Sequence, residues 1–319
     1  MDLLIQTVWE GLVAGVLYAL IALGFVLIFK ASSVFNFAQG IMVVFSALTL
    51  VGTYEALARN GLTGFPGAML ALVITLGVMY LLAVAIERIV LRPLVNQPDI
   101  ILFMATFGLT YLLIGIGEAI FGGATKTMIT SQLGLPTGST SFVLPGMGPG
   151  GREGFVLIQH LDIAAAVIAT VMICALAAFF QYTRVGRALR AVADSHKAAL
   201  SVGISLNHIW IVVWFTAGIV ALVTGIMWGA RSDVSFALQI IALKALPVLI
   251  LGGFTSIPGA IVGGLIIGIG EKMGELYLAP MLLGAMGKGV ESWLAYFIAL
   301  GFLMFRPQGL FGDKIIERI

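Results

Sequence analysis

Charged side chains are scarce in this sequence. Only 10% of its 319 residues are Asp, Glu, Lys or Arg, whereas 60% are apolar and the mean hydropathy is +1.11. Soluble domains carry roughly a quarter charged residues, so water is not the main solvent of this chain. The net charge of +2 provides no overall field that attracts nucleic acid. The composition therefore predicts an integral membrane protein with lipid around it and no nucleic-acid partner.

Residues for covalent or metal chemistry are equally few. The single cysteine, Cys174, excludes an intrachain disulfide and a cysteine zinc cluster, and we interpret it as a small packing residue. The motifs of zinc proteases and serine hydrolases are missing, and the glycine-rich stretches 123–127 and 146–151 lack the spacing of a phosphate loop or a dinucleotide fingerprint. We therefore expect no enzymatic activity, no bound metal or cofactor, and no ATP hydrolysis by this chain itself.

Apolar runs of about 20 residues recur along the chain, and each is long enough to span a bilayer as a helix. They lack the alternation of barrel strands, and helices satisfy their own backbone hydrogen bonds in lipid. The candidate spans are 8–29, 34–57, 67–90, 99–121, 160–182, 208–230, 237–254, 257–275 and 290–305. The predicted fold is an all-α polytopic membrane protein of about eight to ten helices, with residues 1–319 in a single transmembrane domain. Polar and glycine residues near 36–40 and 244–258 predict that some helices are broken or re-entrant.

Forty glycines, many of them inside the apolar runs, predict that these helices pack closely. Pairs of glycines four residues apart bring helix backbones together, and we favour this packing role over direct contact with a solute. The pairs are Gly11 and Gly15, Gly225 and Gly229, Gly259 and Gly263, and Gly264 and Gly268.

The distribution of Lys and Arg predicts the orientation of the chain. With nine spans and the N-terminus outside, the basic segment 183–207 lies in the cytoplasm. One re-entrant span would reverse the side of the N-terminus, whereas the basic segment would stay inside. The segment 122–158, rich in Gly, Pro, Ser and Thr, is expected to be an outer loop of turns with room for a short hairpin.

Polar side chains inside the apolar runs are costly in lipid and usually face a cavity or a partner. Asn36 and Gln39 stand at the start of the second span, where a helix N-terminus facing a pathway offers N–H donors to a carboxylate. The alternative, equally weighted, is that both amides satisfy backbone groups at a kink. Lys244 is either deeply buried and paired or extends to an interface, and it is a candidate for the solute pathway. Carboxylates near expected helix ends are interpreted as solvated at the interface: Glu10, Glu118, Glu271 and Glu275.

The cytoplasmic segment 183–207 carries the sharpest pattern. Arg187, Arg190 and Asp194 recur at helical spacing along one stripe, and an alanine pair and a glycine follow: Ala198, Ala199 and Gly203. We expect a basic helix, a short alanine-rich helix and a turn, which a soluble partner can grip to move the bundle. An amphipathic helix lying on anionic lipid is the alternative.

Several segments together resemble the permease subunits of bacterial branched-chain amino acid ABC importers, of the LivH type. The resemblance covers almost the whole chain and includes Asn-Phe-Ala-Gln-Gly at 36–40 and Arg-Pro-Gln-Gly-Leu-Phe-Gly at 306–312. The other segments that carry it are 15–24, 34–35, 186–204 and 251–264. Family members commonly have His and Glu where this chain has Gln39 and Ile41, so a protonatable pair is absent here.

The resemblance implies a type II ABC importer-like permease in the bacterial inner membrane that moves branched-chain or other amino acids by alternating access. It also implies partners: a second permease subunit, LivM-like or identical, two ATP-binding subunits that hold ATP and Mg²⁺, and a periplasmic solute-binding protein. Ala198, Ala199 and Gly203 then correspond to a coupling motif that docks the ATPase. A stand-alone channel or an ion-coupled secondary transporter is the alternative function.

Overall fold

The computed structural model of the chain describes residues 2–32, 35–94, 97–145, 153–194, 201, 203, 206–282 and 290–312. The chain divides into two compact units. The terminal unit consists of Met1–Ala22, Leu135–Thr170 and Lys244–Ile319, and the central unit consists of Leu23–Gly134 and Val171–Leu243. The long helices α1 (Asp2–Ser32) and α5 (His160–Tyr182) each contribute to both units.

Seven helices in the described residues are long and apolar enough to cross a membrane. They are Asp2–Ser32, Gln39–Arg59, Gly64–Leu94, Ile100–Phe121, His160–Tyr182, Asn207–Ser232 and Ile257–Met281. Two shorter apolar helical stretches, Leu238–Gly252 and Trp293–Phe305, coincide with the predicted seventh and ninth spans. The helical membrane fold is thereby confirmed.

Helix α2 (Gln39–Arg59) is the core of the central unit, because every residue from Gln39 to Val51 is buried. It packs against α3 (Gly64–Ala85), α4 (Asp99–Phe121), α8 (Leu206–Ser232) and α9 (Leu238–Leu243). Gly225 of α8 permits one of these contacts, since a Cβ there would lie 2.6 Å from the carbonyl oxygen of Val43. A π-helix, Ile86–Leu91, and a 3₁₀ turn, Arg92–Leu94, extend α3, and α6 (Arg184–Asp194) packs on α8.

In the terminal unit, the first part of α1 packs backbone to backbone on α11 (Ile257–Met273). A Cβ on Gly15 would lie 2.7 Å from the carbonyl oxygen of Gly264, and a Cβ on Gly264 would lie 2.6 Å from that of Gly15. One turn away, a Cβ on Gly11 would lie 2.8 Å from the Cα of Ile269. The close packing predicted for these glycine pairs is therefore confirmed, and only glycine fits at the contact.

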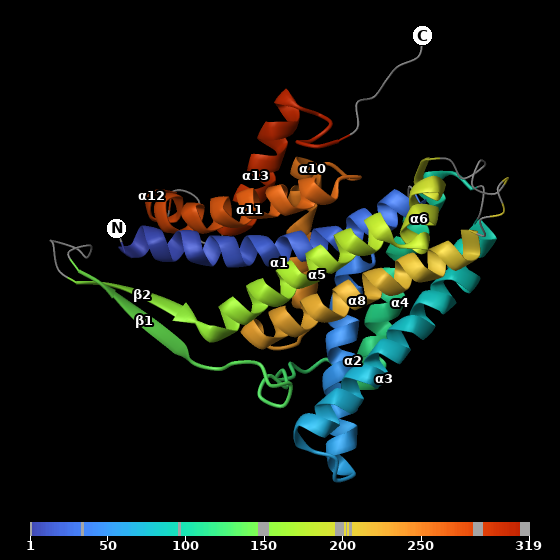
Figure 1. Cartoon of the computed structure of the whole chain (residues 1–319), viewed down its shortest axis with the longest axis horizontal. Helices are drawn as coiled ribbons and strands as arrows, with labels where there is room; N and C mark the ends of the chain where they lie inside the picture. The colour runs from blue at the N-terminus through green and yellow to red at the C-terminus, as the bar shows by residue number, and fades with distance from the viewer. Residues whose placement is uncertain are drawn as a thin grey trace. The chain divides into compact units, whose positions relative to one another are not determined.

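The terminal unit also contains α10 (Ala245–Gly252), the π-helix Gly274–Leu278, α12 (Ala279–Leu282) and α13 (Val290–Phe305). The strands β1 (Ser139–Leu144) and β2 (Gly154–Gln159) pair antiparallel, so the hairpin foreseen in segment 122–158 is present (Figure 1). The packing role predicted for Cys174 is wrong, because its side chain is exposed on α5, a helix long and apolar enough to span a membrane.

The interruption predicted around 244–258 is present as two breaks. Lys244 separates α9 from α10, and α11 begins after Ser256, whose hydroxyl accepts a hydrogen bond from the N–H of Gly259 at 3.0 Å. The segment that follows α13 contacts the end of α10, just before this second break. The N–H of Leu310 donates to the carbonyl of Leu251 at 2.8 Å, which satisfies a carbonyl that the end of α10 leaves open.

Candidate functional site

The turn before α2 lies in the interior of the central unit, where Asn36 and Gln39 are both 0% exposed. Asn36 Oδ1 accepts a hydrogen bond from the N–H of Ala38 at 3.0 Å, and its Nδ2 donates to Gln39 Oε1 at 3.4 Å. Gln39 Nε2 donates to the carbonyl of Ala217, in α8, at 3.3 Å. These bonds satisfy the amides at a kink, and a pathway role for either residue stays a prediction.

Thr106 of α4 holds the same turn from another side. Its hydroxyl donates to the carbonyl of Phe35 at 3.2 Å and accepts from the N–H of Phe37 at 3.1 Å. The ring centroids of Phe37 and Phe107 lie 5.0 Å apart, so apolar contacts surround these bonds. Sequence reasoning missed Thr106, although a threonine inside an apolar helix is a recognised source of interhelical hydrogen bonds.

Lys244 occupies the break between α9 and α10, and its partner is Glu271 of α11. The two charged groups are 2.6 Å apart, and their side chains are 16% and 6% exposed. The interpretation of Glu271 as a solvated interfacial carboxylate is therefore wrong, because the apolar helix continues beyond it to Met281. Its second oxygen, Oε2, is buried and has no hydrogen-bond partner among the described residues.

A buried carboxylate with one open oxygen is costly in an apolar surrounding. The Lys244 ammonium offsets the charge, and the remaining lone pairs can accept a further donor. Lys244 and Glu271 thus bring a cation and an anion together at a helix break.

Helix α6 turns a basic face outward and an apolar face inward. Leu189 and Val192 are buried, whereas Arg187 and Arg190 are exposed. Arg187 Nη1 donates to the carbonyl of Tyr182 at 3.2 Å, and Arg190 Nη2 donates to that of Gln181 at 3.3 Å. The guanidinium groups therefore satisfy carbonyls at the C-terminal end of α5, where cations are favoured.

The rest of the predicted coupling segment is described only in part. Asp194 is the last residue of α6, and Ala198 and Ala199 lie outside the described residues. Gly203 is exposed and has a φ of 82°, a left-handed conformation that glycine adopts without strain. This conformation agrees with the turn expected at that position.

A bundle of long apolar helices, with broken helices and a buried ion pair at one break, defines a multi-pass membrane transport protein. Residues 7–305 match the family described as the permease component of the branched-chain amino acid transport system. The chain belongs to this family. It is a permease component of an ABC transport system, which works with ATPase and binding-protein partners and does not itself hydrolyse ATP.

Curated relatives match the chain over nearly its full length. The high-affinity branched-chain amino acid transport system permease protein BraD of Pseudomonas aeruginosa is 27% identical, over 99% of this chain and 98% of its own. The corresponding protein LivH of Escherichia coli strain K12 is 26% identical, over 99% of this chain and 97% of its own. A solved structure of PsaBC from Streptococcus pneumoniae in complex with Fab covers 97% of this chain and 93% of its own, at 13% identity and a TM-score of 0.46.

Proposed function

We propose that this chain carries branched-chain or other amino acids inward across a bacterial inner membrane by alternating access. Residues 1–319 act as one permease domain beside a second permease subunit, either identical or LivM-like. Two ATP-binding subunits hold ATP and Mg²⁺ on the cytoplasmic side, and a periplasmic binding protein delivers the solute. The observation that carries the proposal is the match of residues 7–305 to permease components of branched-chain amino acid transport systems.

The geometry of α6 supports a coupling role for the segment 183–207. Its apolar face packs on α8, so a force applied to the helix reaches a long spanning helix directly. Arg187 and Arg190 join α6 to the end of α5 in the same way. We assign the docking of the ATP-binding subunit to the exposed basic face of α6, with Arg187 and Arg190, and to the residues that follow in the sequence: Asp194, Ala198, Ala199 and Gly203.

The helix break at Lys244 supports the proposal that the solute pathway passes this residue. Broken helices and intramembrane charges mark solute sites in many transporters, because the break exposes backbone groups and the charge recognises a polar solute. We assign Lys244, with Glu271, to the pathway. Asn36 and Gln39, which hold the start of α2 at the α1–α2 turn, are our further assignments to the pathway.

Co-purification tests the partnership. The full chain is affinity-tagged in its native host, extracted in mild detergent, and its associated subunits are counted by native mass spectrometry. The proposal predicts two permease subunits together with two ATP-binding subunits. Recovery of this chain alone, with leucine transport by the purified chain in vesicles driven by an ion gradient, would instead support a secondary transporter.

A further inference from the structure

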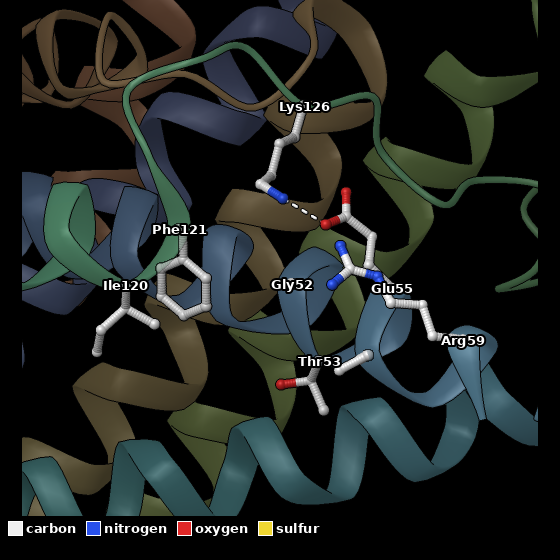
Figure 2. Close-up of a pocket in the computed structure, with 8 residues that line it drawn as sticks. Gly52, Thr53, Glu55, Arg59, Ile120, Phe121 and Lys126 are labelled. Carbon is white, nitrogen blue, oxygen red and sulfur yellow. Dashed lines mark hydrogen bonds and ion pairs between the residues drawn. The ribbon is translucent and has the colours of Figure 1, made fainter.

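A pocket with a volume of about 470 Å³ opens in the central unit where α2 and α4 end (Figure 2). Its lining includes Glu55 and Arg59 of α2, Ile120 and Phe121 of α4, and Lys126 of the following loop. Pockets of about 300–1,000 Å³ accommodate small molecules. Its size and its mixture of charged and apolar walls suit a small amphiphilic solute.

Local structure fixes each wall of this pocket. Glu55 and Arg59 are four residues apart and therefore share one face of α2. On the same face, Gly52 admits the ring of Phe121, since a Cβ there would lie 2.7 Å from Phe121 Cε1. The backbone of Lys126 forms two hydrogen bonds with that of Val234. The N–H of Lys126 donates to the carbonyl of Val234 with an N to O distance of 2.9 Å, and the N–H of Val234 donates to the carbonyl of Lys126 at 2.8 Å.

The charges of the pocket do not balance. The Nζ of Lys126 forms an ion pair with Glu55, and Figure 2 shows the Arg59 side chain running back along α2 toward the same carboxylate. The Lys126 side chain is 16% exposed, whereas the Glu55 side chain is 40% exposed and Arg59 is exposed. The pocket lining thus carries two cations and one carboxylate. The Lys126–Glu55 pair is its more desolvated part, where charge-assisted hydrogen bonds are stronger than in water. The surplus positive charge favours a ligand that brings a carboxylate of its own.

We propose that this pocket binds a zwitterionic α-amino acid with an aliphatic side chain, an inference that rests on the proposed function. The α-carboxylate binds Arg59 and Lys126, and the α-ammonium binds Glu55. The aliphatic side chain packs on Phe121 and Ile120. One small region therefore satisfies all three chemical parts of the solute.

The position along the chain fits an entry site. Three helices capable of spanning the membrane, Gly64–Leu94, Ile100–Phe121 and His160–Tyr182, separate Arg59 from the basic segment 183–207. An odd number of crossings places the two on opposite sides of the membrane. With the basic segment in the cytoplasm, the pocket opens on the outer face, where an importer first meets its solute.

Ligand-observed NMR on the purified full chain in lipid nanodiscs tests the pocket. The probes are L-leucine, 4-methylpentanoate, which lacks the ammonium, and 3-methylbutylamine, which lacks the carboxylate. The wild-type chain should bind L-leucine saturably and both single-charge probes more weakly. Arg59→Gln should weaken L-leucine at least about tenfold, the effect of losing one charge-assisted hydrogen bond. Glu55→Gln should remove the preference for L-leucine over 4-methylpentanoate.

Matched variants separate this pocket from charge effects elsewhere. Lys272→Gln removes a cation of the terminal unit that pairs with Glu275 at 2.8 Å, and Glu118→Gln removes an exposed carboxylate of α4 outside the pocket lining. Neither should change binding. Arg59 forms no ion pair with any described residue, so Arg59→Gln should leave the unfolding temperature unchanged and its binding result interpretable.

ATP-driven uptake of L-leucine by the complete wild-type transporter is measured in parallel. Uptake without saturable binding to the chain, or binding that Arg59→Gln leaves unchanged, overturns the pocket assignment while the proposed function stands. A complete transporter that takes up no amino acid overturns the proposed function itself. The altered preference of Glu55→Gln is a result that an ion pair serving only to anchor the loop does not produce.

Discussion

Lys244 and Glu271 form an ion pair with an Nζ to Oε1 distance of 2.6 Å, although 27 residues separate them in the chain. The pair fastens the break between α9 and α10 to the spanning helix α11. Both side chains are largely buried, so each ion depends on the other for the solvation that it lost. A structural role and a pathway role make different predictions for this pair.

Removing one partner should be far more harmful than removing both. Lys244→Met or Glu271→Leu alone should lower the free energy of unfolding by about 3–5 kcal/mol, because an uncompensated buried charge remains. The double variant should recover most of this loss. Chemical unfolding in detergent measures the free energy of unfolding of the wild type, the two single variants and the double variant. The control Lys272→Gln, which breaks an exposed pair, should cost about 1 kcal/mol or less.

The same double variant tests the pathway assignment. If Lys244 and Glu271 contact the solute, the restored protein should insert and assemble normally yet lose amino acid uptake. Normal uptake by the stable double variant would show that the ion pair has only a structural role.

The contact between Gly15 and Gly264 should tolerate no side chain. Gly15→Leu places atoms where the backbone of α11 already lies, and the helices must separate, with a cost of about 1–3 kcal/mol or more. Gly77→Leu is the control, because a Cβ at Gly77 meets nothing within 4 Å. The unfolding temperature should fall only for the Gly15 variant, and equal effects at both sites would contradict close packing.

The side-chain hydrogen bonds at the α1–α2 turn should each contribute to the stability of the protein. Thr106→Val leaves the N–H of Phe37 without its acceptor, and Gln39→Leu removes the side-chain donor to the carbonyl of Ala217 and the acceptor of Asn36 Nδ2. Each should cost about 1–3 kcal/mol of stability. Solute uptake by the folded fraction of Gln39→Leu then separates a pathway role from a structural one. Unchanged uptake kinetics would mean that Gln39 only stabilises the kink.

Charge reversal on α6 should uncouple the transporter without unfolding it. Arg187→Glu keeps the helix but opposes the carbonyls at the end of α5 and reverses the exposed charge, and Gly203→Trp requires a bulky residue at a φ of 82°. Both variants should insert and assemble while ATP hydrolysis no longer depends on solute or drives uptake. Simultaneous ATPase and uptake measurements test this, and normal coupling in both variants would remove the segment from the docking surface.

The long spans and the two breaks could be predicted because they depend on local composition. Hydropathy locates α1 and α11, and the glycines and proline after Lys244 indicate interruption. The burial of Glu271 could not be predicted, since it depends on the helix continuing beyond residue 275 and on a distant lysine. Contacts between remote residues, such as Thr106 with the backbone near Phe37, likewise follow from tertiary packing alone.

We propose that this chain is the membrane part of an ATP-driven amino acid importer. Uptake of radiolabelled L-leucine into proteoliposomes tests it most directly, with the complete set of subunits and with this chain alone. Uptake should require the ATP-binding subunits, the binding protein and ATP together. Leucine transport by this chain alone, at the same rate with or without ATP, would contradict the account.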